Sequence, residues 1–431
     1  MTQNQKRIVN PYKYLVNTFL SLILIGAILL YSPFVRFDGE LHLIDAIFTS
    51  TSAVCVTGLT TVNVSDFSFI GQIVILMLIQ LGGLGIMYLS SVLFLFLRGQ
   101  LSFSQRLMFS KYHGTYEYYN MEQILPIILA YTFSAEIIGA FFLFFGFFME
   151  GASFWKSIYF GIFHSISAFC NAGLSPINTS IVGLNPIVKI TIMFLIVLGG
   201  LGFYIFYDVY MYYKEDLKLR LHTKVVLLTT IALILIGAFG LLFLERGKLA
   251  IIDAFFQSIT ARTAGFNTVD LAKLTNESNF LIIFLMIIGA SPASTGGGIK
   301  TSTAFVAFFT IYTVLKGKFY FVIFKRRIPT ETIMRSFSLT LLYLFVLFIG
   351  TILILATHNF SLLDSAFEVT SALGTVGLSL GITKELSYIG KIIIILCMFL
   401  GRVGPAALLL MMINKEKMDK IIYPEEKVLL G

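Results

Sequence analysis

The hydrophobic positions of this chain fall into eight long apolar stretches that alternate with shorter apolar segments and polar loops. The long stretches cover residues 15–32, 69–97, 124–149, 187–213, 224–244, 280–315, 336–357 and 389–413. A helix needs about 20 residues to cross the hydrocarbon core of a bilayer, so the stretches predict membrane spans. Taken in chain order as four pairs, the two stretches of each pair enclose one shorter segment: 43–54, 156–169, 251–261 and 363–373. They are too short to cross, and they predict re-entrant helices.

A turn that contains glycine follows each short segment, and the turns predict four internal repeats. The turns are Val56, Thr57 and Gly58; Asn171, Ala172 and Gly173; Thr263, Ala264 and Gly265; and Thr375, Val376 and Gly377. A phenylalanine lies nine or ten residues before each turn glycine. Another glycine lies 24 to 26 residues after it, namely Gly82, Gly199, Gly289 or Gly401. Two motifs that recur in register four times are not expected by chance.

The spans and turns together predict an all-α integral membrane protein. Its architecture is four tandem M1–pore-loop–M2 repeats, arranged with pseudo-fourfold symmetry around one central pore. We expect the repeats at 15–112, 113–222, 223–330 and 331–431, with a cytoplasmic N-terminus at 1–14 and a short cytoplasmic segment at the C-terminal end.

Composition and charge support the membrane class and predict an orientation. Hydrophobic residues make up 57% of the 431 residues and charged residues only 13%, whereas about a quarter of an ordinary globular domain is charged. The net charge of +8 does not indicate nucleic acid, because 20 of the 31 lysines and arginines fall in the loops on the side of both termini. The excess of basic residues predicts that this side, with both termini, is cytoplasmic.

The four turns predict a cation selectivity filter. Backbone carbonyls can be exposed inside a membrane only where they line a wet cavity, and rings of carbonyls can replace the hydration shell of K⁺. Glycine is suited to the left-handed angles that such turns need. Thr375, Val376 and Gly377 match the first three residues of the potassium-channel sequence TVGYG. His164 and Glu368 are expected to brace the turns from behind. Close helix packing better explains Gly82, Gly83, Gly199 and Gly200.

The long stretch 280–315 is interrupted by small polar residues, glycines and a proline, which predict a broken helix and an intramembrane gating loop at 289–303. Its candidate gate residues are Gly289, Ala290, Ser291, Gly296, Gly297, Gly298 and Lys300.

Two arginines lie within the predicted membrane region, where a charge needs water or a partner. Arg402 stands where the first two repeats have Gly83 and Gly200. It either projects toward the pathway below the turns, as part of the gate, or forms a buried ion pair. Arg262, three residues before Gly265, is expected to point behind the filter and to pair with a carboxylate.

The turn glycines, the loop with Lys300 and the arginine at 402 together resemble the Trk/Ktr/HKT superfamily of potassium transporters. The resemblance covers nearly the whole chain and is closest to KtrB, the membrane subunit of bacterial Ktr systems. It implies a homodimer with one pore per subunit in the plasma membrane of a bacterium. It also implies a cytosolic ring of KtrA-type regulatory subunits that bind ATP or ADP, and K⁺ uptake stimulated by Na⁺. No covalently bound cofactor is implied for this chain.

Other interpretations stay open at the level of sequence. An alternating-access transporter would also use repeats and broken helices, although all four repeats here share one orientation. An intramembrane enzyme is disfavoured, because no paired nucleophile and base and no metal-ligand spacing are found. The basic loops at 214–224 and 316–335 would dock either the regulatory ring or anionic lipid.

Overall fold

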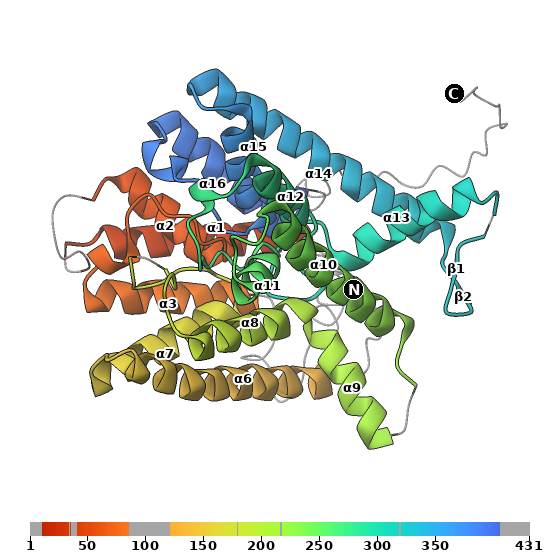
Figure 1. The fold of residues 1–431 in the computed structure, drawn as a ribbon, viewed down its shortest axis with the longest axis horizontal. Coiled ribbons are helices and arrows are strands. Elements are labelled where there is room, and N and C mark those ends of the chain that lie inside the picture. The colour runs from red at the N-terminus through yellow and green to blue at the C-terminus, as the bar shows by residue number, and fades with distance from the viewer. Residues whose placement is uncertain are drawn as a thin grey trace, which may run out of the picture.

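The computed structural model describes residues 11–33, 35, 41–85, 121–178, 180–215, 218–318 and 320–405. Residues 1–10, the predicted span end 86–97, the predicted loop 98–120 and the C-terminal segment 406–431 lie outside the described residues, together with their basic side chains. Apart from one small hairpin, the described secondary structure is helical (Figure 1).

The described helices form four groups, each with a long helix, a short helix and a third helix in that order. The long helices are α1 (Pro11–Tyr31), α6 (Met121–Met149), α10 (Leu221–Leu244) and α14 (Thr330–Thr357). The short helices are α2 (Leu43–Cys55), α7 (Phe154–Phe169), α11 (Ile251–Thr260) and α15 (Leu362–Gly374). The third helices are α3 (Phe69–Leu84), α8 (Pro186–Leu201), α12 (Asn276–Ile287) and α16 (Tyr388–Val403). All four short segments predicted from the sequence are therefore helices.

Two more helices, α9 (Phe203–Glu215) and α13 (Thr301–Leu315), follow the third helices of the second and third groups. After α13 comes an antiparallel hairpin of β1 (Val322–Ile323) and β2 (Arg326–Arg327). Three short 3₁₀ helices, Val64–Asp66, Leu271–Lys273 and Ile382–Glu385, lie in the connections that precede α3, α12 and α16.

The long helices carry the apolar surface of the molecule. Within the described part of the chain, four unbroken helices are long and apolar enough to cross a membrane, and each belongs to a different group: Lys13–Tyr31, Leu125–Met149, Leu221–Leu244 and Thr330–Thr357. Large apolar side chains such as Ile28, Ile137, Phe239 and Phe345 lie exposed on them. An apolar surface of this extent suits lipid, because soluble proteins rarely expose large contiguous apolar patches.

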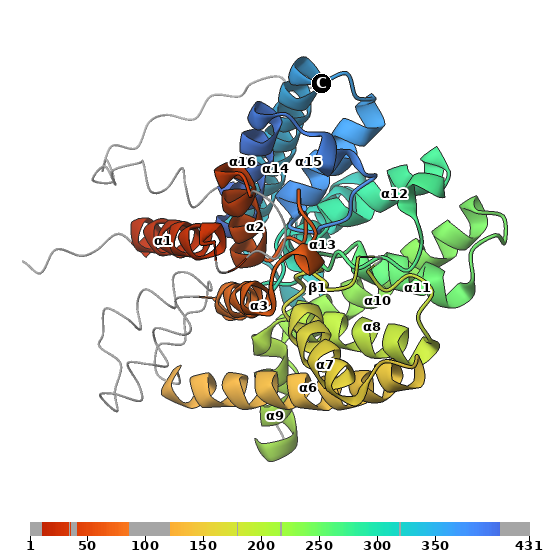
Figure 2. The ribbon, with the colours of Figure 1, turned by 90° about the vertical axis from the view of Figure 1, so that its left-hand side faces the viewer.

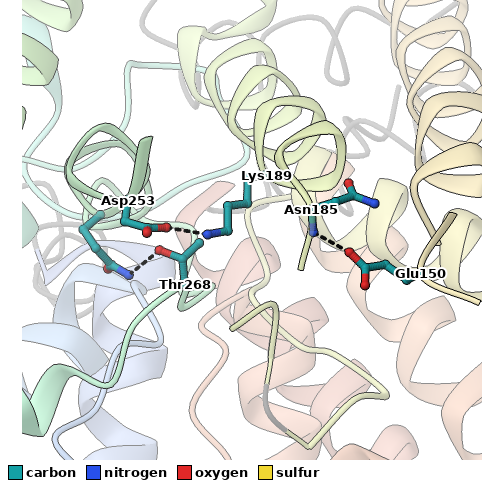
Figure 3. A network of polar contacts seen from close by, with 6 residues as sticks. Glu150, Asn185, Lys189, Asp253 and Thr268 are labelled. Carbon is teal, nitrogen blue, oxygen red and sulfur yellow. Dashed lines mark hydrogen bonds and ion pairs between the residues drawn. The ribbon is translucent and has the colours of Figure 1, made fainter. Parts of the chain in front are cut away.

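Each third helix begins with the same polar cap. The side chains of Ser68, Asn185, Thr275 and Ser387 accept hydrogen bonds from the first helical turn, which otherwise has unpaired N–H groups. The cap residue's own N–H donates to a group just after the long helix of its group. These acceptors are the Val35 carbonyl, the Glu150 and Glu245 carboxylates and the His358 imidazole, at 2.7–2.9 Å. Figure 3 shows the second of these contacts, from Asn185 to Glu150.

Each third helix ends before the end of the span that the sequence predicted for it. The predicted span 187–213 is wrong as a single helix, because α8 and α9 meet at 87° around Gly202, which has a φ of +93°. Helices α3 and α16 end just before Gly85 and Gly404, which also have positive φ. Helix α12 ends at Ile287 and leads into a loop, as expected for 280–315. The sequence predicted a break in the third repeat alone, whereas the third helix ends near the same position in every repeat.

The four groups surround a common centre. Figure 2 looks along this centre, with the first group at the left, the second below, the third at the right and the fourth above. Each third helix packs against the short helix of the next group: α3 on α7, α8 on α11, α12 on α15 and α16 on α2. The last of these contacts closes the ring.

Buried ion pairs clasp two opposite interfaces of this ring. Lys189 of α8 lies 2.7 Å from Asp253 of α11, as Figure 3 shows. Lys391 of α16 lies 2.7 Å from Asp45 of α2, and the exposed fractions of these side chains are 16% and 6%. Both lysines stand four residues after their helix cap, so the two clasps are equivalent by position.

We predict that Lys391→Met destabilises the protein by about 2–4 kcal/mol, because it leaves the Asp45 carboxylate buried without its cation. Thermal unfolding of the purified protein measures this effect. The control is Lys273→Met, which breaks an exposed pair with Asp270 and should change stability by less than about 1 kcal/mol. Equal losses from the two variants would contradict a role for the clasp. The double variant Lys391→Met with Asp45→Asn should recover part of the loss.

Candidate functional site

A left-handed residue follows each of the four short helices, two positions before the turn glycine. These residues are Val56, Asn171, Thr263 and Thr375, with φ between +51° and +75°. Three of them are β-branched, and left-handed angles are strained in such residues. Strain of this kind persists only where the surrounding structure imposes it, and it is concentrated at functional sites. The sequence carried no signal for these positions beyond their spacing from glycine.

The turn glycines are left-handed as well, with φ of +99°, +66°, +78° and +93° in chain order. A Cβ added to any of them would clash with the next turn. It would lie 2.6 Å from the Ala172 carbonyl oxygen at Gly58, 2.5 Å from that of Ala264 at Gly173, 2.4 Å from that of Val376 at Gly265 and 2.2 Å from that of Thr57 at Gly377. Each glycine thus faces the carbonyl of the residue before the following glycine, and the fourth returns to the first. The twelve turn residues predicted from the sequence are brought together in one closed ring.

Polar groups hold the turns from behind. The Gly58 and Gly377 N–H groups donate to the hydroxyls of Ser52 and Ser371, each at 3.0 Å. Past the turn, the Glu368 carboxylate accepts a hydrogen bond from Ser379 at 2.7 Å.

His164 occupies the place in the second repeat that Glu368 has in the fourth. Its Nε2 lies 2.9 Å from the Ser175 hydroxyl, and its Nδ1 lies 2.8 Å from the Phe160 carbonyl. Both ring nitrogens are therefore engaged by protein groups. This geometry agrees with the bracing that the sequence suggested for the two residues.

The predicted gating loop lies directly against two of the turns. The Gly297 N–H donates to the Thr375 hydroxyl at 2.9 Å. A Cβ added to Gly296 would lie 2.0 Å from the Thr263 hydroxyl oxygen. The loop folds back on itself, because the Gly289 N–H donates to the Ile299 carbonyl at 3.0 Å.

Within the loop, Lys300 and Ser291 make further contacts. Lys300 donates to the Gly296 carbonyl at 2.6 Å, and Thr301 donates to the Ser291 hydroxyl at 3.0 Å. Gly298 is left-handed, with a φ of +69°. The interrupted stretch is therefore a compact, hydrogen-bonded loop rather than an open one.

The loop also docks onto the break between α8 and α9. The Ser291 N–H donates to the Gly200 carbonyl at 3.0 Å, and the Phe203 N–H donates to the Ala293 carbonyl at 3.0 Å. Carbonyls that the helix break leaves unpaired are satisfied by the loop in this way. The break in the second repeat and the loop of the third are one structural unit.

Arg402 joins this unit to the first repeat. Its guanidinium donates to the carbonyls of Thr295 in the loop and of Gly82 and Gly83 at the end of α3, the last at 3.3 Å. The guanidinium therefore lies against backbone carbonyls of the first and third repeats, and its place in the gate stays a prediction.

Arg262 departs from expectation. Its side chain is buried, as expected, but the described residues place no carboxylate within ion-pair distance of it. Its one hydrogen bond to a described residue is a long one to the Gly289 carbonyl, at 3.5 Å. The expected carboxylate partner of Arg262 is therefore wrong for the described part of the chain.

The glycines of the third helices serve close packing. A Cβ added to Gly82, Gly199 or Gly401 would lie 1.8–2.1 Å from a carbonyl oxygen near the end of the short helix in the same repeat. This agrees with the packing role inferred from the sequence for Gly82 and Gly199, and at Gly83 an added Cβ would lie 2.6 Å from the Cys170 sulfur. At Gly200 the nearest atom is 3.4 Å away, so that glycine is not required by close packing.

Comparison with known proteins places these features in a family. A family model described as a cation transport protein, TrkH, matches residues 2–422. The chain belongs to the TrkH cation transport family. Its expected resemblance to the Trk and Ktr proteins is thereby confirmed.

Individual relatives of this TrkH family member match along nearly their whole length. The chain is 38% identical to the Ktr system potassium uptake protein B of Vibrio alginolyticus, over 96% of this chain and 93% of that protein. It is 36% identical to the potassium/sodium uptake protein NtpJ of Enterococcus hirae, over all of both chains. The crystal structure of the potassium transporter TrkH from Vibrio parahaemolyticus matches with a TM-score of 0.71 and 19% identity, over 96% of this chain and 86% of that one. The predicted fold class, an all-α membrane protein of four repeats, is confirmed by this match.

We predict that Gly199→Ala prevents correct packing of the TrkH-family fold, whereas the neighbouring Gly200→Ala is tolerated. At Gly199 the new methyl group would lie 1.8 Å from the Phe169 backbone oxygen; at Gly200 the nearest atom is 3.4 Å away. The yield of monodisperse protein after detergent extraction, compared for the two variants, measures the difference. A normal yield for Gly199→Ala would contradict the close approach of α8 and α7.

Proposed function

We propose that this chain carries K⁺ into the cell through a selectivity filter formed by its four turns. The observation that supports the proposal most directly is the closed ring of glycines, each facing a carbonyl of the next repeat. The relatives named as potassium uptake proteins make K⁺ the expected cargo.

A filter of this kind would use the backbone in two ways. Carbonyl oxygens of the turns would replace the water around a K⁺ ion. The C-terminal ends of four short helices meet at the ring, and the negative ends of their dipoles favour a cation there. No acidic side chain is needed for either effect, and the twelve turn residues include none.

The loop at 289–303 and Arg402 would form the gate. The loop lies next to Thr263 and Thr375 on two sides of the ring, and Arg402 ties it to α3 on another. A positive charge at this place raises the energy of a passing cation. Ion passage would therefore require the loop and the arginine to move together.

Further features of the proposal rest on the family. We propose repeats at 15–112, 113–222, 223–330 and 331–431, with both termini in the cytoplasm of a bacterial cell. Two chains would form a homodimer on a KtrA-type cytosolic ring that binds ATP or ADP, and the ring would control the loop. The name of the Enterococcus relative, a potassium/sodium uptake protein, supports a link to Na⁺. The surrounding lipid would contact the exposed apolar faces of the long helices.

We predict that Gly377→Ala abolishes K⁺ uptake, because its methyl group would enter the ring 2.2 Å from the Thr57 carbonyl oxygen. The matched control is Gly381→Ala. Gly381 is also left-handed, with a φ of +108°, but an added Cβ has no neighbour within 4 Å there. Backbone strain of about 1 kcal/mol is thus common to both variants, and only the first obstructs the ring. The measurement is growth at low K⁺ of an uptake-deficient bacterium that expresses each variant with a regulatory partner.

Two results of this experiment would contradict the proposed filter. Uptake by Gly377→Ala equal to that of Gly381→Ala would exclude a conduction path through the ring. Loss of uptake in both variants, with normal amounts of protein in the membrane, would assign the defect to strain and not to obstruction.

We predict that Arg402→Gln increases K⁺ flux several-fold in the absence of the regulatory partner, because the loop loses its tie to α3 and the pathway loses a positive charge. Flux of ⁸⁶Rb⁺ into proteoliposomes measures it. Lys384→Gln is the control, since Lys384 is an exposed cation bonded to Asn63 outside this region. If ⁸⁶Rb⁺ flux through Arg402→Gln equals that of the wild type, the arginine is not part of the gate.

A further inference from the structure

A small pocket lies behind the third turn, between the second and third repeats. It is lined by Ile196, Val197 and Gly200 of α8, Thr230 and Ile234 of α10, Ile259 and Arg262 beside the turn, and Ala290 of the loop. The pocket has space for little more than one water-sized particle. Apart from the arginine and the threonine, the side chains that line it are apolar.

Among the described residues, the two polar side chains of the pocket have donors without acceptors. Arg262 is 7% exposed, and of its five N–H donors one has an acceptor among the described residues, the Gly289 carbonyl at 3.5 Å. Its Nε is buried without a partner in the described part of the chain. The Thr230 hydroxyl, 5% exposed, is likewise unpaired there. A buried cation with so few acceptors is costly unless another group balances it.

The other interfaces show that this arrangement is specific to one place. The residues three positions before the turn glycines are Cys55, Cys170, Arg262 and Gly374, so one of the four is charged. Between the fourth and first repeats, Arg402 itself occupies the interface and binds carbonyls. The equivalent of Arg402 in the second repeat is Gly200, where an added Cβ has its nearest neighbour at 3.4 Å. The pocket is the space that this glycine leaves beside Arg262.

We propose that this pocket binds one small monovalent anion, such as a halide, between the Arg262 guanidinium and the Thr230 hydroxyl. Both groups can donate to the same ion, and the ion would balance the buried charge that no described carboxylate balances. The size of the pocket excludes sulfate and phosphate. An anion there would also offset the positive charge beside Thr263, so that a cation in the adjacent turn is less repelled. Binding of the anion itself does not depend on the proposed transport function.

The test uses the full-length protein in lipid nanodiscs at constant K⁺, with gluconate replaced stepwise by bromide. The midpoint of thermal unfolding, Tm, should rise by roughly 2 °C or more and then saturate, because bromide binds the folded state. Thr230→Val should remove at least half of the shift, and Arg262→Gln should remove it altogether. The matched control is Thr132→Val. Thr132 has the same place in α6, seven residues before Gly139 as Thr230 is before Gly237, and its hydroxyl is also buried and unpaired among the described residues.

Anomalous diffraction from crystals grown in bromide gives the position of the ion, and a peak beside Arg262 is expected. A wild-type Tm that does not respond to bromide, with water alone in the pocket, would overturn the proposal. So would an equal response to bromide in Thr230→Val and Thr132→Val, because a general salt effect is common to both. Should Arg262→Gln not fold, the two threonine variants decide the question. K⁺ uptake is measured separately, so failure of the anion site and failure of the transport proposal are distinguishable.

Discussion

The direct contact of four left-handed turns, with no space for a side chain between them, is the constraint on which the rest of the structure depends. Non-helical backbone within a membrane is tolerated only where it is buried in protein or lines a water-filled cavity. Each short helix is packed by the third helix of the preceding repeat. In the first, second and fourth repeats it is also packed by the third helix of its own repeat, through a glycine. Because the fourth repeat returns to the first, no turn has a free side, and the strain at Val56, Thr263 and Thr375 is held by the closed ring.

The four turn glycines of the site could be predicted from the sequence. Gly58, Gly173, Gly265 and Gly377 are demanded by backbone angles and by carbonyls within 2.6 Å of an added Cβ, so their spacing repeats with the fold. The left-handed residues two positions earlier were not predictable. A valine or threonine gives no local signal for positive φ, and the conformation is imposed by contacts between repeats.

The sequence does not distinguish a glycine that allows close helix packing from a glycine that breaks a helix. In α8, Gly199 packs against a carbonyl and Gly202, three residues later, breaks the helix at 87°. Both lie in one apolar stretch, where periodicity cannot separate a packing glycine from a hinge. The clasps of Lys189 with Asp253 and Lys391 with Asp45 were also missed, because the partners are far apart in sequence and meet only when the repeats close into a ring.

The two intramembrane arginines show how the same charge is accommodated in different ways. Arg402 ends against three carbonyls from two repeats, two of them at the end of α3, where helix dipole and unpaired acceptors favour a cation. Arg262 has one distant carbonyl, and apart from Thr230 the side chains that line its pocket are apolar. Its charge is therefore balanced neither by a described carboxylate nor by a comparable set of acceptors. The loop contacts both, through Thr295 at Arg402 and Gly289 at Arg262. Any movement of the loop must therefore change the surroundings of two buried charges, which couples its position to the electrostatic field at the turns.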